Sequence, residues 1–298
     1  MSGRPMPTGF PTGPLVDDGL IPPWMHALTG DVTQLTTIVN NRGGDRARLA
    51  RMMVKARNRR AAAVLVLLSG RFDADPARPG GLPDDAEILL LERATTLRQH
   101  SGQVAFPGGA HDEGEDYPVR TALREAQEET GLDPDGVRVL ANLPSFSTLP
   151  SPFEVVPVLS YWERPSPVWA VDQGETARVA RVRVAELLDP ANRFQVRRDF
   201  LGGRVYQGPA FLVDGMLVWG FTGGLFDAIS KACRWDVPWN TDDVRPLDEA
   251  IASARSEQDH GLPLDLPFPP DADDFDGDGD DLDGDDLDGD EAPAGDRR

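Results

Sequence analysis

The sequence predicts an α+β protein in which a mixed β-sheet packs against helices and both ends of the chain are flexible. Three observations support this fold class: short apolar runs typical of strands, two segments with helical periodicity, and no regular alternation of strands with helices. The chain has 298 residues, of which 40% are hydrophobic, so it is long enough to bury a sizeable core. This composition excludes collagen-like, fibrous and disulfide-rich classes.

The predicted elements lie within residues 24–240, which we expect to form one domain. The strand-like runs are rich in aliphatic residues and are bounded by Gly, Pro and Asp. These runs cover residues 61–69, 86–93, 103–106, 137–142, 153–162 and 178–184. The helical patterns cover residues 118–130 and 221–232, with weaker patterns over 31–39 and 45–57.

Both ends of the chain are predicted to be flexible. Residues 1–23 are rich in Pro and Gly, and residues 241–298 read as a linker followed by a disordered acidic tail. Residues 265–298 hold fifteen acidic residues and two arginines, and therefore supply −13 of the net charge of −20. Asp-Gly repeats from Asp274 match the opening of an EF-hand loop, but no helix flanks them, so a solvating tail with an unknown partner is favoured.

Charge and cysteine content narrow the classes of partner. An acidic chain is not expected to bind nucleic acid or anionic membranes. Cys233 is the only cysteine, so no intrachain disulfide can form and the cytoplasm is the expected compartment. The N-terminus lacks the apolar run of a signal peptide, and residues 61–69 are far shorter than the roughly 20 residues of a membrane span. The expected partner is a small-molecule substrate, and a homodimer is left open.

The segment 118–130 is predicted to be an amphipathic helix. Asp116 is a candidate N-cap, Pro118 suits the first turn, and Gly131 suits the C-terminal exit. At 100° per residue, an apolar stripe centred on Ala122 falls on one face, which we expect to pack against the sheet.

Glu125, Glu128 and Glu129 occupy a neighbouring arc of the same helix, so three carboxylates point the same way. Two such charges about 5 Å apart repel by roughly 3 kcal/mol at an effective dielectric constant near 20, and a divalent cation would reverse this sign. Carboxylate oxygens are hard ligands of the kind that Mg²⁺ or Mn²⁺ binds. The alternative is a solvated acidic face in which Arg124 pairs with Glu128 at i, i+4.

The sequence flanking these glutamates favours the metal site. Residues 124–132, REAQEETGL, resemble the REUxEExGU half of the Nudix box, and Gly109 followed by Glu115 resembles its Gly-x5-Glu half. Eight residues separate Glu115 from Arg124 where the box has seven, and taking Asp116 as the acid would lengthen the glycine spacing instead. Whether Glu115 or Asp116 takes the acidic position of the box therefore stays open. The resemblance implies a Nudix-like fold, with a mixed sheet sandwiched between helices, and pyrophosphohydrolase activity.

A second signature precedes the box. Residues 89–109 resemble the LLTxRSx(3,4)RxHxGxxxFPGG pattern of the coenzyme A pyrophosphatase branch of Nudix hydrolases, with Leu91 and Ala94 in place of its Thr and Ser. The resemblance implies metal-dependent hydrolysis of the diphosphate bond of coenzyme A (CoA) or acyl-CoA. The products would be 3′,5′-ADP and 4′-phosphopantetheine or its acyl form.

The expected roles of individual residues follow from these motifs. Glu125, Glu128 and Glu129 are the expected metal ligands, and one of them, or Glu175 in a later loop, is the expected general base. Arg124 is expected to serve catalysis by orienting a carboxylate through bidentate hydrogen bonds. Arg93, Arg98 and His100 are expected to bind the substrate through their positive charge or hydrogen bonds. Gly108 and Gly109 are expected to let the backbone come close to the substrate or the metal.

Two other functions are consistent with the sequence. The same chemistry could act on another nucleoside diphosphate derivative, such as ADP-ribose or NADH. A noncatalytic Nudix-fold protein could instead use its acidic tail to recruit a basic partner, although the intact set of Glu125, Glu128 and Glu129 argues against this. The basic segment 45–60 is a weaker candidate for contact with an anionic ligand.

Overall fold

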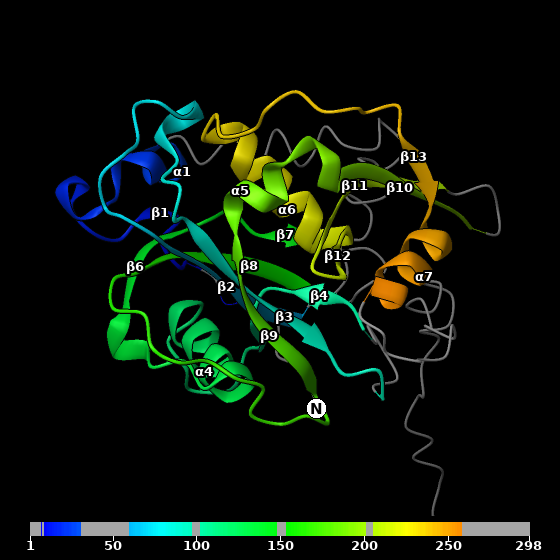
Figure 1. Cartoon of the computed structure of the whole chain (residues 1–298). Helices are drawn as coiled ribbons and strands as arrows, with labels where there is room; N and C mark the ends of the chain where they lie inside the picture. The colour runs from blue at the N-terminus through cyan, green and yellow to red at the C-terminus, as the bar shows by residue number, and fades with distance from the viewer. Residues whose placement is uncertain are drawn as a thin grey trace, which may run out of the picture.

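The computed structural model describes residues 7, 9–30, 60–96, 102–147, 153–200 and 205–257. Within these residues the strands form two sheets, one of nine strands and one of four (Figure 1). The predicted helices over 31–39 and 45–57, the basic segment and the acidic tail from residue 265 lie outside the described residues. The mixed α+β class is confirmed.

The larger sheet is centred on two parallel strands, β2 (Arg60–Ser69) and β8 (Phe153–Trp162). β2 is apolar and buried along nearly its whole length, as expected for a strand covered on both faces. The other strands of this sheet all pair antiparallel with their neighbours. They are β1 (Gly13–Pro14), β3 (Glu87–Arg93), β4 (Val104–Ala105), β5 (Gly108–Ala110), β6 (Val137–Asn142), β7 (Phe146–Ser147) and β9 (Thr176–Arg183). Of these, β3, β4, β6 and β9 confirm predicted runs to within a few residues, whereas β1, β5 and β7 were not predicted.

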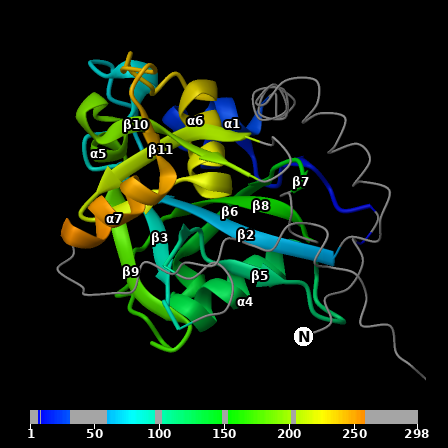
Figure 2. The same cartoon turned by 90° about the vertical axis from the view of Figure 1, so that its right-hand side faces the viewer.

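Helices α4 (Val119–Thr130) and α6 (Gly220–Ala232) cover opposite faces of this sheet, as Figures 1 and 2 show. Alternate residues of β2 explain the arrangement, because successive side chains of a strand point to opposite faces. Leu65 and Leu67 belong to the core cluster that contains the buried alanines of α4, whereas Val66 and Leu68 belong to the cluster that contains the apolar face of α6. The predicted sandwich is therefore confirmed.

The two ends of α4 differ from each other in how well the sequence predicted them. Gly131 ends the helix with a left-handed φ of 66°, as predicted. The predicted Asp116 cap is wrong, because the helix begins at Val119 after Pro118 and no side chain caps it. Asp116 instead accepts a hydrogen bond from the N–H of Arg120 through its main-chain carbonyl.

The second sheet was not predicted from the sequence. Its strand order is β12 (Met216–Val218), β11 (Val205–Val213), β10 (Arg193–Asp199) and β13 (Val244–Pro246), and α7 (Leu247–Glu257) packs against it. β13 and α7 lie in the segment predicted to be a linker, and β1 lies in the predicted N-terminal tail. Ordered structure therefore extends past both predicted boundaries. The remaining short helices are η1 (Asp18–Leu20), η2 (Pro23–Met25), α1 (His26–Thr29), η3 (Pro79–Gly81), η4 (Pro134–Gly136), α5 (Val184–Leu188) and η5 (Pro190–Asn192).

A buried ion pair joins the second sheet to helix α6. Arg193 on β10 is fully buried, and its Nη2 lies 3.2 Å from Oδ1 of Asp227 on α6. Asp227 also accepts a hydrogen bond of 3.0 Å from Nζ of Lys231. Burial lowers the pKa of Arg193 to about 10, so this guanidinium stays charged at neutral pH.

Removing the carboxylate of this pair should strongly destabilise the protein. We expect Asp227→Ala to lower the free energy of unfolding by about 3–5 kcal/mol, because the buried guanidinium of Arg193 loses its counter-charge. Lys231→Ala is the control and should cost about 1 kcal/mol or less, since this ammonium is half-exposed. Urea unfolding monitored by fluorescence measures both, and equal stabilities for the two variants would contradict the assignment.

Candidate active site

The three carboxylates of α4 differ in their exposure. The side chains of Glu125 and Glu129 are 18% and 9% exposed, whereas that of Glu128 is 58% exposed. The difference follows from the helix, because Glu125 and Glu129 flank the face that packs on the sheet while Glu128 lies further round. Two of the three predicted metal ligands are therefore held inside the protein and one lies at its surface.

Arg124 contacts three glutamate carboxylates at once, and its Nη2 also lies 3.6 Å from Oδ2 of Asp112. Its Nη1 donates to Oε2 of Glu128 at 2.8 Å, its Nη2 lies 3.0 Å from Oε1 of Glu125, and its Nε donates to Oε1 of Glu115. Nη2 also donates to the carbonyl of Ala110 at 3.1 Å, which ties the side chain to β5. A planar guanidinium has donors in fixed directions, so this one group sets the positions of the carboxylates around it.

Glu115 is the acidic residue that meets Arg124, which resolves the open loop register. Its Oε2 also accepts hydrogen bonds from the hydroxyl of Thr121 at 2.8 Å and from the N–H of Asp112 at 3.3 Å. Burial raises the pKa of Glu115, but the hydrogen bonds from Arg124 and Thr121 outweigh this effect and leave the pKa below its usual value. The extra loop residue is accommodated before α4, where Asp116 contributes only its main chain.

Gly108 and Gly109 make room for the carboxylates. A Cβ on Gly109 would lie 2.4 Å from Cδ of Glu125, and a Cβ on Gly108 would lie 2.3 Å from the carbonyl oxygen of Ala63 on β2. The N–H of Gly108 donates to Oε2 of Glu129 at 2.9 Å. Only glycine permits β5 to approach both β2 and α4 this closely. The two glycines contact glutamates in this structure, and the predicted approach of their backbone to a phosphate or metal stays a prediction.

Glu129 lies in an environment that disfavours its charged form. Burial raises its pKa to about 7; the hydrogen bond from Gly108 and the charge of Arg93 oppose the rise, and the charges of Glu125 and Glu175 add to it. Nη1 of Arg93 lies 3.5 Å from Oε1 of Glu129. Burial likewise raises the pKa of Glu125, against the opposing charge of Arg124. Like charges are thus crowded into a site with little solvent.

Of the other predicted site residues, Glu175 and Arg93 can be located in the structure. Arg98 and His100 lie outside the described residues. Glu175 is exposed at the start of β9, where its carbonyl accepts a hydrogen bond of 2.8 Å from the N–H of Ala94. Nε of Arg93 is buried and has no hydrogen-bond partner in the described part of the chain. The end of β3, the end of α4 and the start of β9 therefore meet around Glu129.

The predicted convergence of three carboxylates on one point is not observed. In the part of the chain that the structure describes, no group of three or more His, Cys, Asp or Glu side chains is arranged to hold a metal ion. The physical reason is that Arg124 holds the carboxylate of Glu128, while Gly108 holds that of Glu129. The donor chemistry still fits a hard divalent cation, because Glu125 and Glu129 are oxygen donors with little exposed surface. Burial and the charge of Glu125 both raise the pKa of Glu129, and a bound cation would relieve this crowding of negative charge.

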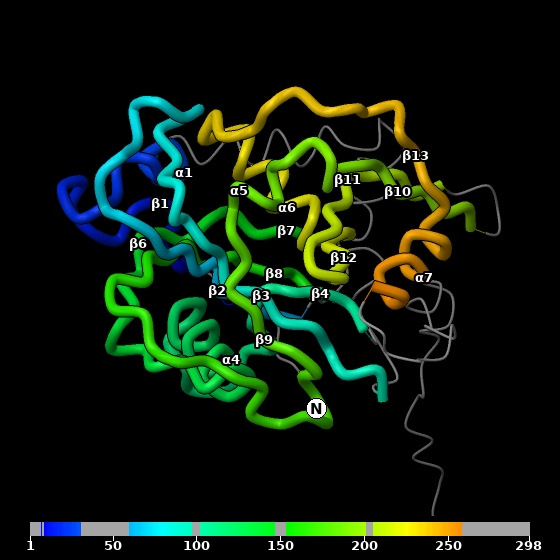
Figure 3. The backbone as a smooth tube through the Cα atoms, in the orientation of Figure 1, coloured from blue at the N-terminus to red at the C-terminus, as the bar shows by residue number. Residues whose placement is uncertain are grey.

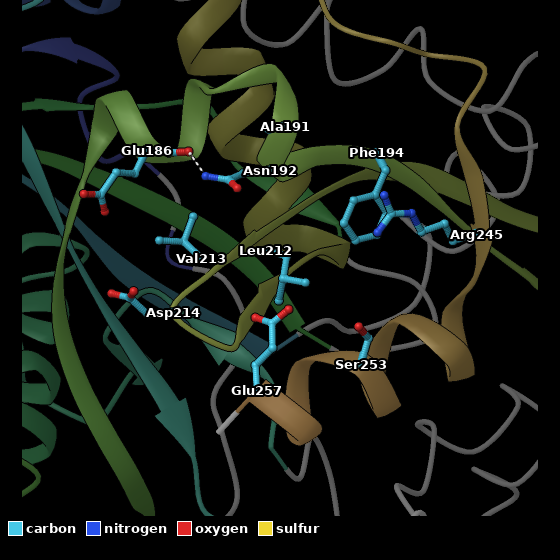
Figure 4. A pocket seen from close by; sticks show the side chains of 10 residues that line it. All are labelled: Glu186, Ala191, Asn192, Phe194, Leu212, Val213, Asp214, Arg245, Ser253 and Glu257. Carbon is cyan, nitrogen blue, oxygen red and sulfur yellow. Dashed lines mark hydrogen bonds between the residues drawn. The ribbon is translucent and has the colours of Figure 1, made fainter. Parts of the chain in front are cut away.

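A cavity of about 410 Å³ lies elsewhere in the molecule (Figure 4). Its walls come from α5, η5, β10, the turn between β11 and β12, β13 and α7, and include Phe194, Asp214 and Arg245. None of its lining residues belongs to α4 or β5. This cavity therefore lies apart from the glutamates of α4. We assign the chemistry to those glutamates, because the pKa values of Glu125 and Glu129 are raised and such shifts are typical of functional sites.

Two supporting residues were not singled out from the sequence. Nδ1 of His111 lies 3.3 Å from Oγ1 of Thr121, and the His111 ring packs against Tyr117 with the ring centres 5.0 Å apart. Thr121 in turn donates to Glu115. The only signal in the sequence was their position, since both lie between the glycines and the glutamates.

Comparisons with known proteins identify the family of the chain. The family model of the NUDIX domain matches residues 57–201. The uncharacterized Nudix hydrolase NudL of Citrobacter koseri is 34% identical over 168 residues, which cover 56% of this chain and 80% of that protein. NudL of Salmonella dublin, also named an uncharacterized Nudix hydrolase, is 33% identical over 174 residues, which cover 58% of this chain and 83% of that protein. The crystal structure of the Nudix hydrolase RenU of M. smegmatis is 26% identical, with a TM-score of 0.34, and covers 44% of this chain and 74% of that one.

The chain belongs to the Nudix hydrolase family. Members of this family generally use divalent metal ions and act on small molecules that are derivatives of nucleotides. Among the described residues, no helix has both the length and the apolar character that crossing a membrane requires.

The buried carboxylate of Glu129 should make the stability of the metal-free protein depend on pH. Its pKa is about 7 in the folded state and 4.5 as a free side chain, so the folded state binds this proton more tightly. The free energy of unfolding should therefore fall by up to about 3 kcal/mol as the pH rises from about 4.5 to 7. Glu129→Gln should remove this loss.

Urea unfolding in EDTA across this pH range measures the effect. Glu128→Gln is the matched control, because this neighbouring glutamate is exposed, and it should keep the pH dependence of the wild type. A Glu129→Gln variant with the same pH dependence as the wild type would show that Glu129 is not the group responsible.

Proposed function

We propose that this chain hydrolyses the diphosphate bond of CoA and acyl-CoA to 3′,5′-ADP and 4′-phosphopantetheine or its acyl form. The observation that supports this most directly is the contact of 3.5 Å between Arg93 and Glu129. Arg93 belongs to the signature of residues 89–109, and Glu129 belongs to the helix of the Nudix box. Their contact brings residues of the two motifs next to each other, which supports a substrate shared by both.

Mg²⁺ or Mn²⁺, held by Glu125, Glu128 and Glu129, would polarise phosphate oxygens and lower the pKa of a bound water. Arg124 would keep the carboxylates of Glu125 and Glu128 in position through the hydrogen bonds and ion pairs described above. Releasing Glu128 from Arg124 would require a change of rotamer and the loss of one ion pair at the surface.

A carboxylate must accept the proton of the attacking water. Glu129 is one candidate, because its carboxylate has little exposed surface and lies where the ends of β3 and α4 and the start of β9 meet. Glu175 is the second candidate, since its charge acts on Glu129 and its side chain is exposed. Both lie at the junction of α4 and β9, so the proton acceptor is proposed to come from this junction.

Arg93, Arg98 and His100 are the proposed contacts for the phosphate groups of CoA. The side chain of Arg93 is 31% exposed, and its Nε is a buried donor without a partner among the described residues. An unpaired buried donor is costly, and a phosphate oxygen is a strong acceptor for it. Gly108 and Gly109 would allow the backbone of β5 to come close to the diphosphate.

A substrate panel tests the proposed function. CoA, acetyl-CoA, NADH and ADP-ribose are incubated with Mg²⁺ or Mn²⁺, and the products are identified by mass. We expect CoA to give 3′,5′-ADP and 4′-phosphopantetheine, and acetyl-CoA to give the acetylated product. Faster turnover of ADP-ribose or NADH would shift the assignment to another nucleoside diphosphate derivative, and no turnover of any substrate would favour a binding protein.

The role of Arg93 is tested by the ratio of kcat/KM for CoA to that for dephospho-CoA. We expect a preference of about tenfold or more for CoA in the wild type, because the 3′-phosphate adds a charge-assisted hydrogen bond. Arg93→Ala should bring the ratio close to one, even though the loss of its contact with Glu129 also lowers turnover. A ratio that stays unchanged would remove Arg93 from the 3′-phosphate site.

Loss of a buried carboxylate should abolish most of the activity without unfolding the protein. We expect Glu125→Gln to lower kcat beyond the 10- to 100-fold that loss of an outer-shell partner of a metal typically costs. Glu186→Gln on α5 is the matched control and should turn over like the wild type. Circular dichroism verifies folding, and full activity of Glu125→Gln would exclude this residue from the reaction.

A further inference from the structure

Two exposed apolar side chains lie in the segment that joins β8 to β9. Trp169 is 55% exposed and Val171 is 50% exposed. Exposing an indole to water is costly, and large exposed apolar groups that gather in one place often mark a binding site. The site described so far assigns no role to either residue.

The segment is anchored on the last turn of α4. The N–H of Trp169 donates to the carbonyl of Thr130 at 3.0 Å, and the N–H of Val171 donates to the carbonyl of Glu129 at 3.4 Å. Figure 3 shows the segment passing alongside α4 on its way to β9. The backbone of Val171 is therefore bonded directly to the residue whose carboxylate lies at the centre of the site.

The indole of Trp169 rests on Gly131. A Cβ on Gly131 would lie 2.7 Å from the six-membered ring of the indole, so the ring covers the position where a side chain would stand. One side of the ring thus lies against the end of α4, while more than half of the side chain remains open to solvent. A flat aromatic surface held in this way is suited to stack on another flat ring.

The other end of the segment meets the end of β3. The hydroxyl of Thr96 donates to the carbonyl of Gly174 at 3.2 Å, and Thr176 pairs with Arg93 in the sheet. The segment therefore runs from Gly131, past Glu129, to the strand that carries Arg93. It forms one border of the candidate active site, and Trp169 and Val171 lie along that border.

We propose that Trp169 stacks on the nucleobase of the substrate, with Val171 contacting the edge of the same ring. This inference rests on the proposed function to the extent that the diphosphate of the ligand lies at the carboxylates of α4. The ligand class it names is a nucleotide with a planar aromatic base. A flexible acyl chain would gain less from a single flat ring, because it cannot match the ring face to face.

Equilibrium dialysis in the presence of magnesium tests this proposal with two probes. AMP carries the base, and ribose 5-phosphate lacks it but keeps the sugar and the phosphate. We expect Trp169→Ala to weaken AMP binding by roughly 5- to 150-fold, the range for loss of one base–aromatic stack. Binding of ribose 5-phosphate should not change. Trp169→Phe should retain most of the affinity for AMP, because a smaller aromatic ring still stacks.

Val244→Ala is the matched control, because Val244 is an exposed apolar residue on the second sheet. It should bind both probes like the wild type. In turnover assays Trp169→Ala should raise KM with kcat unchanged, since the base is remote from the bond that breaks. Circular dichroism confirms that the variants fold, and Trp169→Leu replaces Trp169→Ala if the alanine variant does not.

Three results would overturn the proposal: wild-type protein that does not bind AMP, a Trp169→Ala variant that binds AMP normally, or equal losses for AMP and ribose 5-phosphate. Failure of the proposed function is distinguishable from these results. A protein that binds AMP through Trp169 but hydrolyses none of the diphosphate substrates would retain the stacking site and lose the hydrolase assignment.

Discussion

The contact between Arg124 and three carboxylates is the interaction on which the candidate active site depends. Glu115, Glu125 and Glu128 are all held by one guanidinium, which is itself tied to β5 through Ala110. Without that positive charge the acids would repel one another, by several kcal/mol for a pair a few ångströms apart at an effective dielectric constant near 20. Arg124 therefore acts on the site by positioning other side chains, and it connects the loop before α4 to the helix.

The packing beneath this network explains why the acids can come so close to the sheet. Ala122 and Ala126 are fully buried between α4 and the sheet, and small side chains allow the helix to approach β2. The same approach brings Glu125 and Glu129 against β5, where Gly108 and Gly109 have no side chains to exclude them. Small residues on both elements are thus the sequence features that allow these two carboxylates to be buried.

The sequence predicted the parts of the fold that have strong local signals. The apolar run of β2, the periodicity of α4 and the glycine at its end were all recognised, because each is set by its own residues. The second sheet was missed because only two of the seven residues of β10, Phe194 and Val196, are apolar and fully buried in the core. Such a strand is recognisable only together with its partners, β11, which follows it along the chain, and β13, which lies more than 40 residues further on.

In the candidate site, too, the sequence could not predict what depends on contacts with other parts of the chain. Spacing identified Glu125, Glu128 and Glu129 but could not decide between Glu115 and Asp116, since both fit the motif equally badly. The choice depends on where the loop before α4 turns, and only the hydrogen bonds of Glu115 reveal it. The convergence of the three carboxylates on one point stays a prediction for a related reason: helical geometry gives the direction of a side chain, whereas its rotamer depends on neighbours such as Arg124 and Gly108.

The balance of charges shows what the site requires of a ligand. Glu115, Glu125, Glu128 and Glu129 supply four carboxylates, and the guanidiniums of Arg124 and Arg93 contact them. A diphosphate would bring further negative charge into this surplus of acids, where burial already raises the pKa of Glu125 and Glu129. Two anionic groups share a poorly solvated site only when a cation lies between them. The crowding of like charge is therefore the feature of this helix that fits the proposed divalent metal and, with it, the proposed phosphoanhydride substrate.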